Sequence, residues 1–458
     1  MENYFGRKEE LQQLAEIYDS DRFEFGYVYG QRRIGKTTLM QMFAQGRKTL
    51  FLFATDSEDI ENRAGFSREL DRMMNRKGGI YTDWSSFFEA VESFFGNEKG
   101  LLVIDEYPNL IFTRDGKRKK TDFASSLQKA IDLLFKKGKF MLVLTGSNVS
   151  FMEREIKDSK APLYKRNTFQ LQVHKLEFNE AVSALAPVKD SFEKAKFLAL
   201  TNTFPYYLSL IDVSKSFSDN LNHLFFDRTA VFADDPSKVI TADVATSGLY
   251  ASIIKAIAEG NTTVVELCKR LNEDSSKISK YIKRLVADNV LIRRTAFHSK
   301  RDIHYEIFDP MMAFFYRFIR EDIEWIKFGE GKAIRARKEA AIKEFIEHGF
   351  EKVCLTYLEY LNKNSKLLTF YRHFENLTIG NSSLGRSIEI DVVATDDDNL
   401  LIAESKLSSQ QRTYRDYHDM LEDTSVPPLS NYQNKELYLF GANGFTDELK
   451  KVKMIDHI

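Results

Sequence analysis

Apolar, strand-like runs alternate with amphipathic helical patterns up to about residue 175. The runs are FGYVYG, TLFLFA, GLLVIDE, KFMLVLTGS and TFQLQV. Between them, DWSSFFEAVESFFG and DFASSLQKAIDLLFKKG repeat Phe, Ala and Leu at three- and four-residue spacing, which is typical of helices that bury one face. This alternation predicts an α/β fold, a parallel sheet covered by helices.

The pattern then changes three times along the chain. Residues 176–240 show helical periodicity only, and residues 241–310 contain short helical segments followed by the strand-like VLIRRTAF and IHYEIF. Residues 311–458 return to mixed helix and strand. We therefore expect four domains, 1–175, 176–240, 241–310 and 311–458, without internal repeats.

Composition narrows the class of protein. The 458 residues are 43% hydrophobic, enough for more than one core, and the net charge of −1 gives no overall case for nucleic acid. Two cysteines, Cys268 and Cys354, are too few for a disulfide framework or a zinc knuckle. The first residues carry charges where a signal peptide needs an apolar core, and no run approaches the length of a membrane span. We expect a soluble cytoplasmic protein without membrane contact.

The stretch GQRRIGKTT, residues 30–38, fits the phosphate-loop pattern G-x-x-x-x-G-K-[ST] between a strand and a helix. Gly30 and Gly35 would let backbone amides surround a phosphate. Lys36 would reach the outer phosphates and the Thr37 hydroxyl would ligate magnesium. Arg33 and Thr38 are further candidate nucleotide-binding residues in this stretch. The motif predicts ATP and Mg²⁺ as ligands.

The run LLVIDE ends in two acids at the expected carboxyl edge of the sheet. Asp105 could hold magnesium through water, and Glu106 could orient or deprotonate an attacking water. Solvated acids after a buried strand are common, so the prediction depends on the phosphate loop beside them.

These stretches resemble the additional-strand P-loop ATPases, and within them the archaeal-type ATPase family related to the AAA+ and STAND proteins. YFGRKEELQQL, LTGSNVSFM, APLYKR and FPYYL extend the resemblance over about residues 4–240. It implies that Ser147 senses the γ-phosphate and that Arg166 stabilises phosphate charge, in cis or from a neighbouring subunit of a homo-oligomer. The chain departs from the family at LTNTFPYYL, which lacks the two glycines expected before the proline of the lid.

Residues 245–310 are typical of a winged helix-turn-helix, three helical segments followed by two strands around HSKRD. The third helix would present Lys277, Lys280 and Arg284, and the wing Lys300 and Arg301, as contacts to DNA phosphates. The alternative is a regulatory spacer with a solvated basic face. A second basic stretch, RDGKRKK at residues 114–120, is more typical of a solvated loop.

Near the carboxyl end, NLLIAESKL places Glu404 and Lys406 two residues apart, on one face of a strand. Asp391 ends the preceding strand SIEIDVVA, and the TDDDN turn allows an antiparallel pair that brings it opposite. Two carboxylates could hold a divalent metal while Lys406 positions or activates a water for attack on a phosphodiester.

This arrangement resembles the PD-(D/E)xK nuclease superfamily, although Ile390 stands where that superfamily often has proline. The resemblance implies a further helix acid upstream, for which Glu351 is the candidate. The alternative is a structural role, in which the acids and the lysine form only cross-strand pairs. Glu389 is a spare candidate, and residues 396–398 are expected to be solvated turn formers.

Together the patterns predict a P-loop ATPase sheet with a helical lid, a winged helix and a carboxyl-terminal restriction-endonuclease-like α/β domain. The predicted function is ATP hydrolysis coupled to metal-dependent cleavage of DNA. Two alternatives stay open: a nucleotide-controlled switch whose carboxyl-terminal domain binds without cutting, and a transcription regulator.

Overall fold

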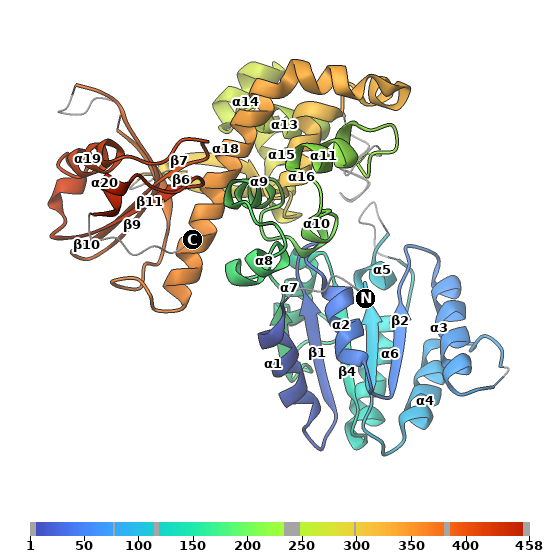
Figure 1. The fold of residues 1–458 in the computed structure, drawn as a ribbon. Coiled ribbons are helices and arrows are strands. Elements are labelled where there is room, and N and C mark those ends of the chain that lie inside the picture. The colour runs from blue at the N-terminus through green and yellow to red at the C-terminus, as the bar shows by residue number, and fades with distance from the viewer. Residues whose placement is uncertain are drawn as a thin grey trace. The chain divides into compact units, whose positions relative to one another are not determined.

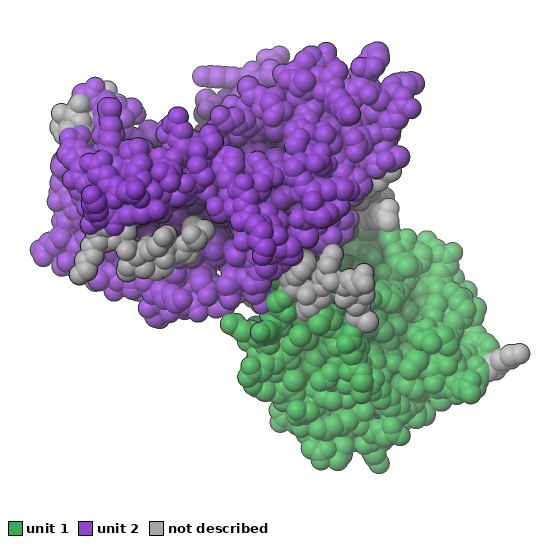
Figure 2. Space-filling view, in the orientation of Figure 1, with its two compact units in different colours: residues 1–176, 238–248, 287–289 green, residues 177–237, 249–286, 290–458 purple. Residues whose placement is uncertain are grey.

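The computed structural model describes residues 6–76, 78–113, 119–232, 248–296, 299–379 and 385–451, and it leaves out the side chains of residues 296–302. The chain divides into two compact units (Figure 2). Unit 1 comprises residues 1–176, 238–248 and 287–289, and unit 2 comprises residues 177–237, 249–286 and 290–458. The predictions for residues 114–118 and for the side chains of Lys300 and Arg301 concern positions outside the described residues.

Unit 1 is built on a five-stranded sheet in the order β2-β3-β4-β1-β5, in which every strand pair is parallel. The strands are β1 Glu24–Tyr29, β2 Thr49–Phe53, β3 Leu101–Asp105, β4 Met141–Gly146 and β5 Phe169–Gln172. Strands β1, β3 and β4 are buried at every position, which explains their continuous apolar runs. The predicted parallel α/β sheet is confirmed.

Helices cover this sheet, with α1 near β1 and α3 and α4 toward the β2 edge (Figure 1). They are α1 Lys8–Tyr18, α2 Lys36–Ala44, α3 Asp59–Met73, α4 Trp84–Phe95, α5 Pro108–Ile111, α6 Phe123–Leu133, the short η1 Phe135–Lys137 and α7 Val149–Lys157. The aromatic spacing noted in the sequence becomes the core, since Trp84 of α4 meets Phe123 of α6 edge to face at a centroid distance of 4.8 Å.

The first part of unit 2 is helical. It comprises α8 Phe178–Ala184, α9 Ser191–Thr201, α10 Pro205–Ser209, α11 Phe217–Leu221 and η2 Asn222–Phe226. Three further helices and an antiparallel hairpin follow, α13 Gly248–Ala258, α14 Val264–Leu271, α15 Ser275–Ala287, β6 Leu291–Ala296 and β7 Ser299–Ile307. At the departure from the lid motif, Asn202 takes a positive φ of 50° and Pro205 begins α10.

The carboxyl-terminal part of unit 2 carries a four-stranded mixed sheet in the order β11-β10-β9-β8, in which only β10 and β11 are parallel. Its helices precede the sheet, lie between β10 and β11, or follow β11. The elements are α16 Pro310–Phe314, η4 Phe315–Ile319, α17 Ile323–Trp325, η5 Ile326–Glu330, α18 Gly331–Lys363, β8 Glu375–Ile379, β9 Ile388–Asp396, β10 Asn399–Lys406, α19 Tyr414–Asp423, η6 Leu429–Asn431, β11 Asn434–Gly441 and α20 Asp447–Lys450. One face of the sheet packs on Met420 of α19, through Leu400 and Ile402 among others. Helix α18 contacts β10 as well.

In the described parts of the chain, no helix combines the length and the apolar character that a membrane span requires.

The long helix α18 packs closely against α9, and Gly349 lies at their closest approach. A methyl group added to Gly349 would lie 2.3 Å from the carbonyl oxygen of Ala199, and backbone cannot yield as a side chain does. We predict that Gly349→Ala destabilises unit 2 by about 2 kcal/mol, measured as a lower midpoint of thermal unfolding.

The matched control is Gly65→Ala, in the middle of α3. The nearest atom to the new methyl group there is 3.9 Å away, on the Arg68 side chain. We expect no loss of stability, because alanine reduces the entropy of the unfolded chain and favours a helix. Equal destabilisation by the two substitutions would show that close packing of α9 on α18 is not the cause.

Candidate functional site

The predicted phosphate loop connects β1 to α2. Gly35 caps α2 with φ 85°, a left-handed conformation that favours glycine, and Arg33 also has a positive φ of 68°. The loop thus presents the amino end of α2, where Lys36 is buried, Thr37 is half-buried and Thr38 is exposed. This geometry leaves backbone amides at a helix start, the arrangement that binds anions.

Lys36 is held inside the loop rather than extended into solvent. Its Nζ donates a hydrogen bond to the carbonyl of Gln31 at 2.8 Å. Burial lowers the pKa of Lys36 to about 8, and the carboxylates of Glu106 and Asp105 oppose this shift. A phosphate would replace the carbonyl with a stronger partner for the ammonium group.

Asp105 is 2% exposed and receives two hydroxyl hydrogen bonds. Thr37 Oγ1 donates to Asp105 Oδ2 at 2.8 Å, and Thr145 Oγ1 donates to Asp105 Oδ1. Burial raises the pKa of Asp105, and the two hydroxyls oppose that rise. A hydroxyl beside a carboxylate supplies the hard oxygen donors that Mg²⁺ prefers, so Thr37 and Asp105 fit this cation.

Glu106 and Ser147, predicted separately, lie together. Ser147 donates to Glu106 Oε2 through its Oγ at 2.9 Å and through its backbone amide at 3.3 Å. Glu106 has a positive φ of 54°, a strained conformation for this residue type, and its own amide donates to Thr145 Oγ1 at 3.2 Å. The carboxylate is therefore fixed beside Asp105 at the carboxyl end of β3.

Two residues of this site escaped the sequence analysis. In the sequence, Thr145 is a polar residue at the end of an apolar run and belongs to no motif. The pairing of Ile104 with Leu144 puts it beside Asp105. Arg7, at 2% exposure, donates to the carbonyl of Ile34 at 2.8 Å and to that of His174 at 2.5 Å. The buried Arg7 thus holds the backbone of the phosphate loop through Ile34. The one signal for this role in the sequence was that Arg7 belongs to the stretch YFGRKEEL.

Arg166 lies elsewhere. It precedes β5, which runs parallel to β1, and so it stands at the amino edge of the sheet, opposite the edge of the phosphate loop. Its guanidinium donates twice to Asp132 of α6, at 2.8 and 3.0 Å. This placement does not support a contact with nucleotide in cis, and a contact from a neighbouring subunit stays a prediction.

In the carboxyl-terminal sheet, Asp391 occupies a bulge of β9. The partners of β8 shift from Glu375↔Val393 to Leu377↔Ile390, which leaves one extra residue in β9. The Asp391 carboxylate reaches across to β10, where Oδ2 accepts from the amide and from the hydroxyl of Ser405, both at 2.8 Å. The bulge thus aims this predicted ligand at the end of β10.

Glu404 shares an electrostatic environment with Asp391. Burial, then the Asp391 carboxylate, raises the pKa of Glu404 to about 8, and the nearby charge of Arg412 opposes that rise. Glu351 of α18 also acts on Glu404, and burial raises the pKa of Glu351 itself. The three predicted acids therefore belong to one neighbourhood, where a cation would relieve their repulsion.

Glu351 is partly engaged by another group. His348 Nδ1 and Glu351 Oε2 lie 2.8 Å apart, and this hydrogen bond raises the pKa of His348. The helix acid that the resemblance implied is thus near Asp391 but directed in part along its own helix.

Lys406 does not join the acids as we expected. It is exposed, and it makes no hydrogen bond or ion pair within the described residues. Burial would raise the pKa of Asp416, but the hydrogen bonds from Thr413 lower it. The charges of Arg412 and then of Lys406 lower it further. A flexible ammonium keeps its hydration at the end of a strand unless a second partner draws it in. The predicted convergence is therefore incomplete: the acids act on one another electrostatically, but in the described residues they do not bring three ligand atoms within 4.8 Å, and the lysine stays outside.

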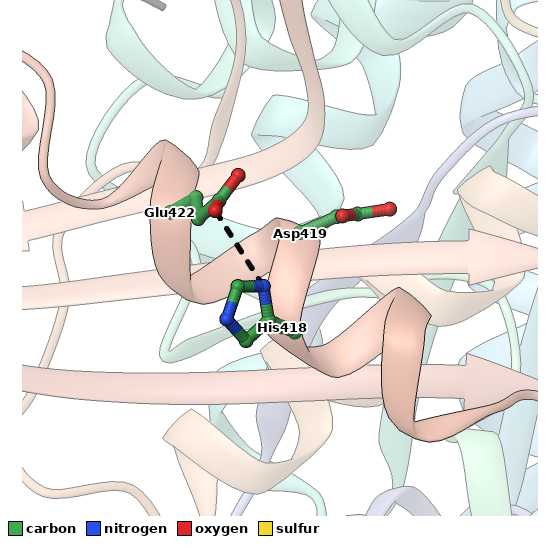
Figure 3. A group of neighbouring side chains, drawn as sticks. All are labelled: His418, Asp419 and Glu422. Atoms are coloured by element: carbon green, nitrogen blue, oxygen red, sulfur yellow. Dashed lines mark ion pairs between the residues drawn. The ribbon is translucent and has the colours of Figure 1, made fainter.

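A different group of potential metal ligands lies on α19 (Figure 3). His418, Asp419 and Glu422 each offer one atom within 4.8 Å of the others, the only such group in the described residues. All three are exposed, and His418 is paired with Glu422 at 3.6 Å. Exposed charges on one helix turn are ordinary without a metal, so we assign no site to them.

The predicted DNA-contacting residues of α15 are exposed. Lys277 is paired with Glu273 at 2.8 Å, while Lys280 and Arg284 lie further along the helix. The buried Ile278, Ile282 and Leu285 define the opposite face, so the basic side chains point outward.

Comparisons with known proteins agree with the nucleotide site. Residues 4–211 match the family described as "ATPase domain predominantly from Archaea", and residues 315–417 match one described as "Archaea bacterial proteins of unknown function". The uncharacterized protein MJECL04 of Methanocaldococcus jannaschii is 28% identical over 444 residues, 94% of each chain. The match over residues 4–211 supports the predicted ATPase domain.

Among solved structures, the Walker-type ATPase PABY2304 of Pyrococcus abyssi aligns with a TM-score of 0.53 and 18% identity, over 68% of this chain and 96% of that one. The ORC2 protein of Aeropyrum pernix aligns with a TM-score of 0.49 and 13% identity, over 72% of this chain and 97% of that one. The first of these likenesses shows a shared fold. Residues 4–211 thus match an ATPase-domain family, and the chain shares its fold with a Walker-type ATPase.

The lowered pKa of Lys36 predicts how nucleotide affinity depends on pH. Without nucleotide the ammonium deprotonates at about pH 8, whereas bound phosphates favour the charged form and raise its pKa. MgATP should therefore bind best below pH 8 and about tenfold more weakly near pH 9 than near pH 7. Calorimetry in two buffers of different ionisation heat should show proton uptake near pH 9.

The matched control is Lys36→Arg, whose guanidinium stays charged at these pH values. Its overall affinity should be lower, but the proton uptake should disappear. Proton uptake that persists in this variant would assign the titration to another group.

Proposed function

We propose that this ATPase domain hydrolyses ATP with Glu106 as the residue that positions the attacking water, and that the whole chain acts on DNA. The observation that carries the first step is the pair of hydrogen bonds from Ser147 to Glu106, at 2.9 and 3.3 Å. They fix a carboxylate beside the Thr37–Asp105 pair, where the γ-phosphate of a nucleotide on the loop would end.

Each side chain then has a distinct task. Lys36 leaves the Gln31 carbonyl and contacts the outer phosphates, while Glu106 accepts a proton from, or orients, the water. Ser147 hydrogen-bonds Glu106 before the reaction and reports whether a γ-phosphate is present. Thr37 and Asp105 would hold Mg²⁺, which when bound neutralises charge on the phosphates.

The action on DNA is proposed from the second unit. Helix α15 and the β6–β7 hairpin have the order of a winged helix, and Lys277, Lys280 and Arg284 line an exposed face of α15. Side chains of this kind contact phosphates and so bind DNA without selecting a sequence. Lys300 and Arg301 of the hairpin are proposed as further contacts.

For the carboxyl-terminal domain we propose metal-dependent cleavage of a phosphodiester. Two features support it, the mixed four-stranded sheet with α18 before it and α19 between β10 and β11, and the bulge at Asp391, whose carboxylate accepts from Ser405, the residue after Glu404. Asp391 and Glu404 are hard oxygen donors, and in the described residues neither carboxylate makes an ion pair. Glu351 is proposed as a further ligand. A bound divalent cation would stabilise charge on the phosphate and lower the pKa of a bound water.

One observation favours a second candidate, a domain that binds DNA without cutting it. Lys406, the expected third member of a cleavage site, is exposed and unpaired within the described residues. If the acids alone gather, the domain could hold a cation and a phosphate without activating a water.

A plasmid assay separates the candidates. Wild-type protein with Mg²⁺ or Mn²⁺ should convert supercoiled DNA to open circles, and Asp391→Ala should reduce the rate about 100-fold or more. The matched control is Asp397→Asn, an exposed turn residue at φ 43° where asparagine is tolerated. Lys406→Ala should abolish cleavage if the lysine moves into the site on binding.

The same assay with ATP tests coupling. We expect Lys36→Ala to change the cleavage rate without altering metal binding, and Glu106→Gln to lower ATP hydrolysis about 100-fold while nucleotide still binds. Intact plasmid with retarded migration in wild type would favour the binding-only candidate. Retardation of one DNA fragment alone would favour a transcription regulator.

A further inference from the structure

Arg412 occupies a constrained position between β10 and α19. Its amide donates to the carbonyl of Gly444 at 3.0 Å, and its carbonyl accepts from the amide of Thr446 at 3.0 Å. This isolated parallel bridge with Phe445 fixes the backbone on both sides of the residue. The direction in which the side chain leaves the backbone is thus set by the fold.

The Arg412 side chain is also buried, with 8% of its surface exposed. Its aliphatic stem packs on the end of β11, where a methyl group on Gly441 would lie 2.6 Å from Arg412 Cγ. Such burial is unusual for arginine unless its guanidinium is paired.

The guanidinium makes few polar contacts for a buried group. Its ion-pair contact in the described residues is Nη1 to Asp416 Oδ1 at 3.5 Å, and Nε there has no hydrogen-bond partner. The Asp416 carboxylate already accepts from the amide and hydroxyl of Thr413, at 2.6 and 2.8 Å. Buried donors without an acceptor are costly, so they mark a place where a partner is missing.

A second unpaired group lies on the other side of the bridge. Thr446 Oγ1 is buried without a hydrogen-bond partner in the described residues. Of the charged groups that act on Glu404, Arg412 is the cation, while Asp391, Asp423 and Glu351 are acids. A buried, incompletely bonded guanidinium that acts on Glu404 differs from Lys406, which is exposed and makes no hydrogen bond or ion pair within the described residues.

A purely structural role would leave different contacts. An arginine that only neutralises Glu404 would donate hydrogen bonds to that carboxylate, and the described residues contain no such bond. The planar guanidinium is also suited to a phosphate, because it can donate two parallel N–H bonds to two of its oxygens.

We propose that Arg412 binds a phosphate of the DNA strand held at the Asp391–Glu404 site and so is a cation of that site. This inference rests on the proposed function of the carboxyl-terminal domain. It assigns to Arg412 substrate binding through phosphate, and not the activation of water.

The test uses the full chain with Arg412→Gln, Arg412→Lys and the control Arg415→Gln. Arg415 follows three residues after Arg412, on α19, but it is 89% exposed and pairs only loosely with Asp419 at 3.9 Å. Affinity for a short DNA duplex is measured in Ca²⁺, which suppresses cleavage, and Mn²⁺ binding is measured by calorimetry without DNA.

We expect Arg412→Gln to weaken duplex binding about tenfold relative to Arg415→Gln. It should at the same time tighten Mn²⁺ binding several-fold, because a positive charge beside the acids is removed. Arg412→Lys keeps the charge but loses the two-pronged donor, so it should leave Mn²⁺ affinity near wild type and still weaken duplex binding. It also serves if Arg412→Gln fails to fold.

Two results would overturn the inference. Duplex affinities of both Arg412 variants equal to that of Arg415→Gln would remove the phosphate contact. Weaker Mn²⁺ binding together with a lower melting temperature in both variants would show a structural role. Failure of the proposed function looks different, since wild-type Mn²⁺ binding would then be absent or unaffected by Asp391→Ala.

Discussion

The hydrogen bond from Thr37 to Asp105 is the interaction on which the nucleotide site depends. It joins the first turn of α2 to the end of β3, segments that are 68 residues apart in the chain. Because Asp105 is buried, its carboxylate requires donors, and Thr37 and Thr145 supply them from two different neighbours of β3. The same bonds that satisfy this buried acid also hold Glu106 and the phosphate loop in register.

The two candidate sites differ in how far their polar groups are already satisfied. Around Asp105 and Glu106, each carboxylate has hydroxyl or amide donors, so the arrangement is organised before any ligand binds. At the end of β10, by contrast, the acids repel one another, and Nε of the buried Arg412 has no acceptor in the described residues. A site in this condition gains more from a bound cation and anion together than from either alone.

The sequence indicated the candidate residues of the phosphate loop and of the end of β3, because their spacing is local. Gly35, Lys36 and Thr37 are contiguous, and the apolar run before Asp105 can only be a buried strand. Thr145 and Arg412 were missed because their roles arise from the pairing of distant strands, which no local pattern records. Lys406 was misplaced for the opposite reason: strand alternation gives the face of a side chain but not whether a long, hydrated ammonium stays in solvent.

The β6–β7 hairpin contacts α18, the helix that carries Glu351, through an ion pair. Glu306 of β7 lies 3.4 Å from Lys352 of α18 and 3.9 Å from Arg294 of β6. Burial alone would raise the pKa of Glu306, but these cations lower it, so the carboxylate stays charged between them. Lys352 follows Glu351 directly in the chain. A phosphate that drew Arg294 away would leave Lys352 of α18 as the ion-pair partner of Glu306 in the described residues. Lys352 is next to Glu351, so this change would reach the acids. If the hairpin binds a DNA strand as proposed, communication with the carboxyl-terminal site would require no large movement within unit 2, only a redistribution of partners around the half-buried carboxylate of Glu306.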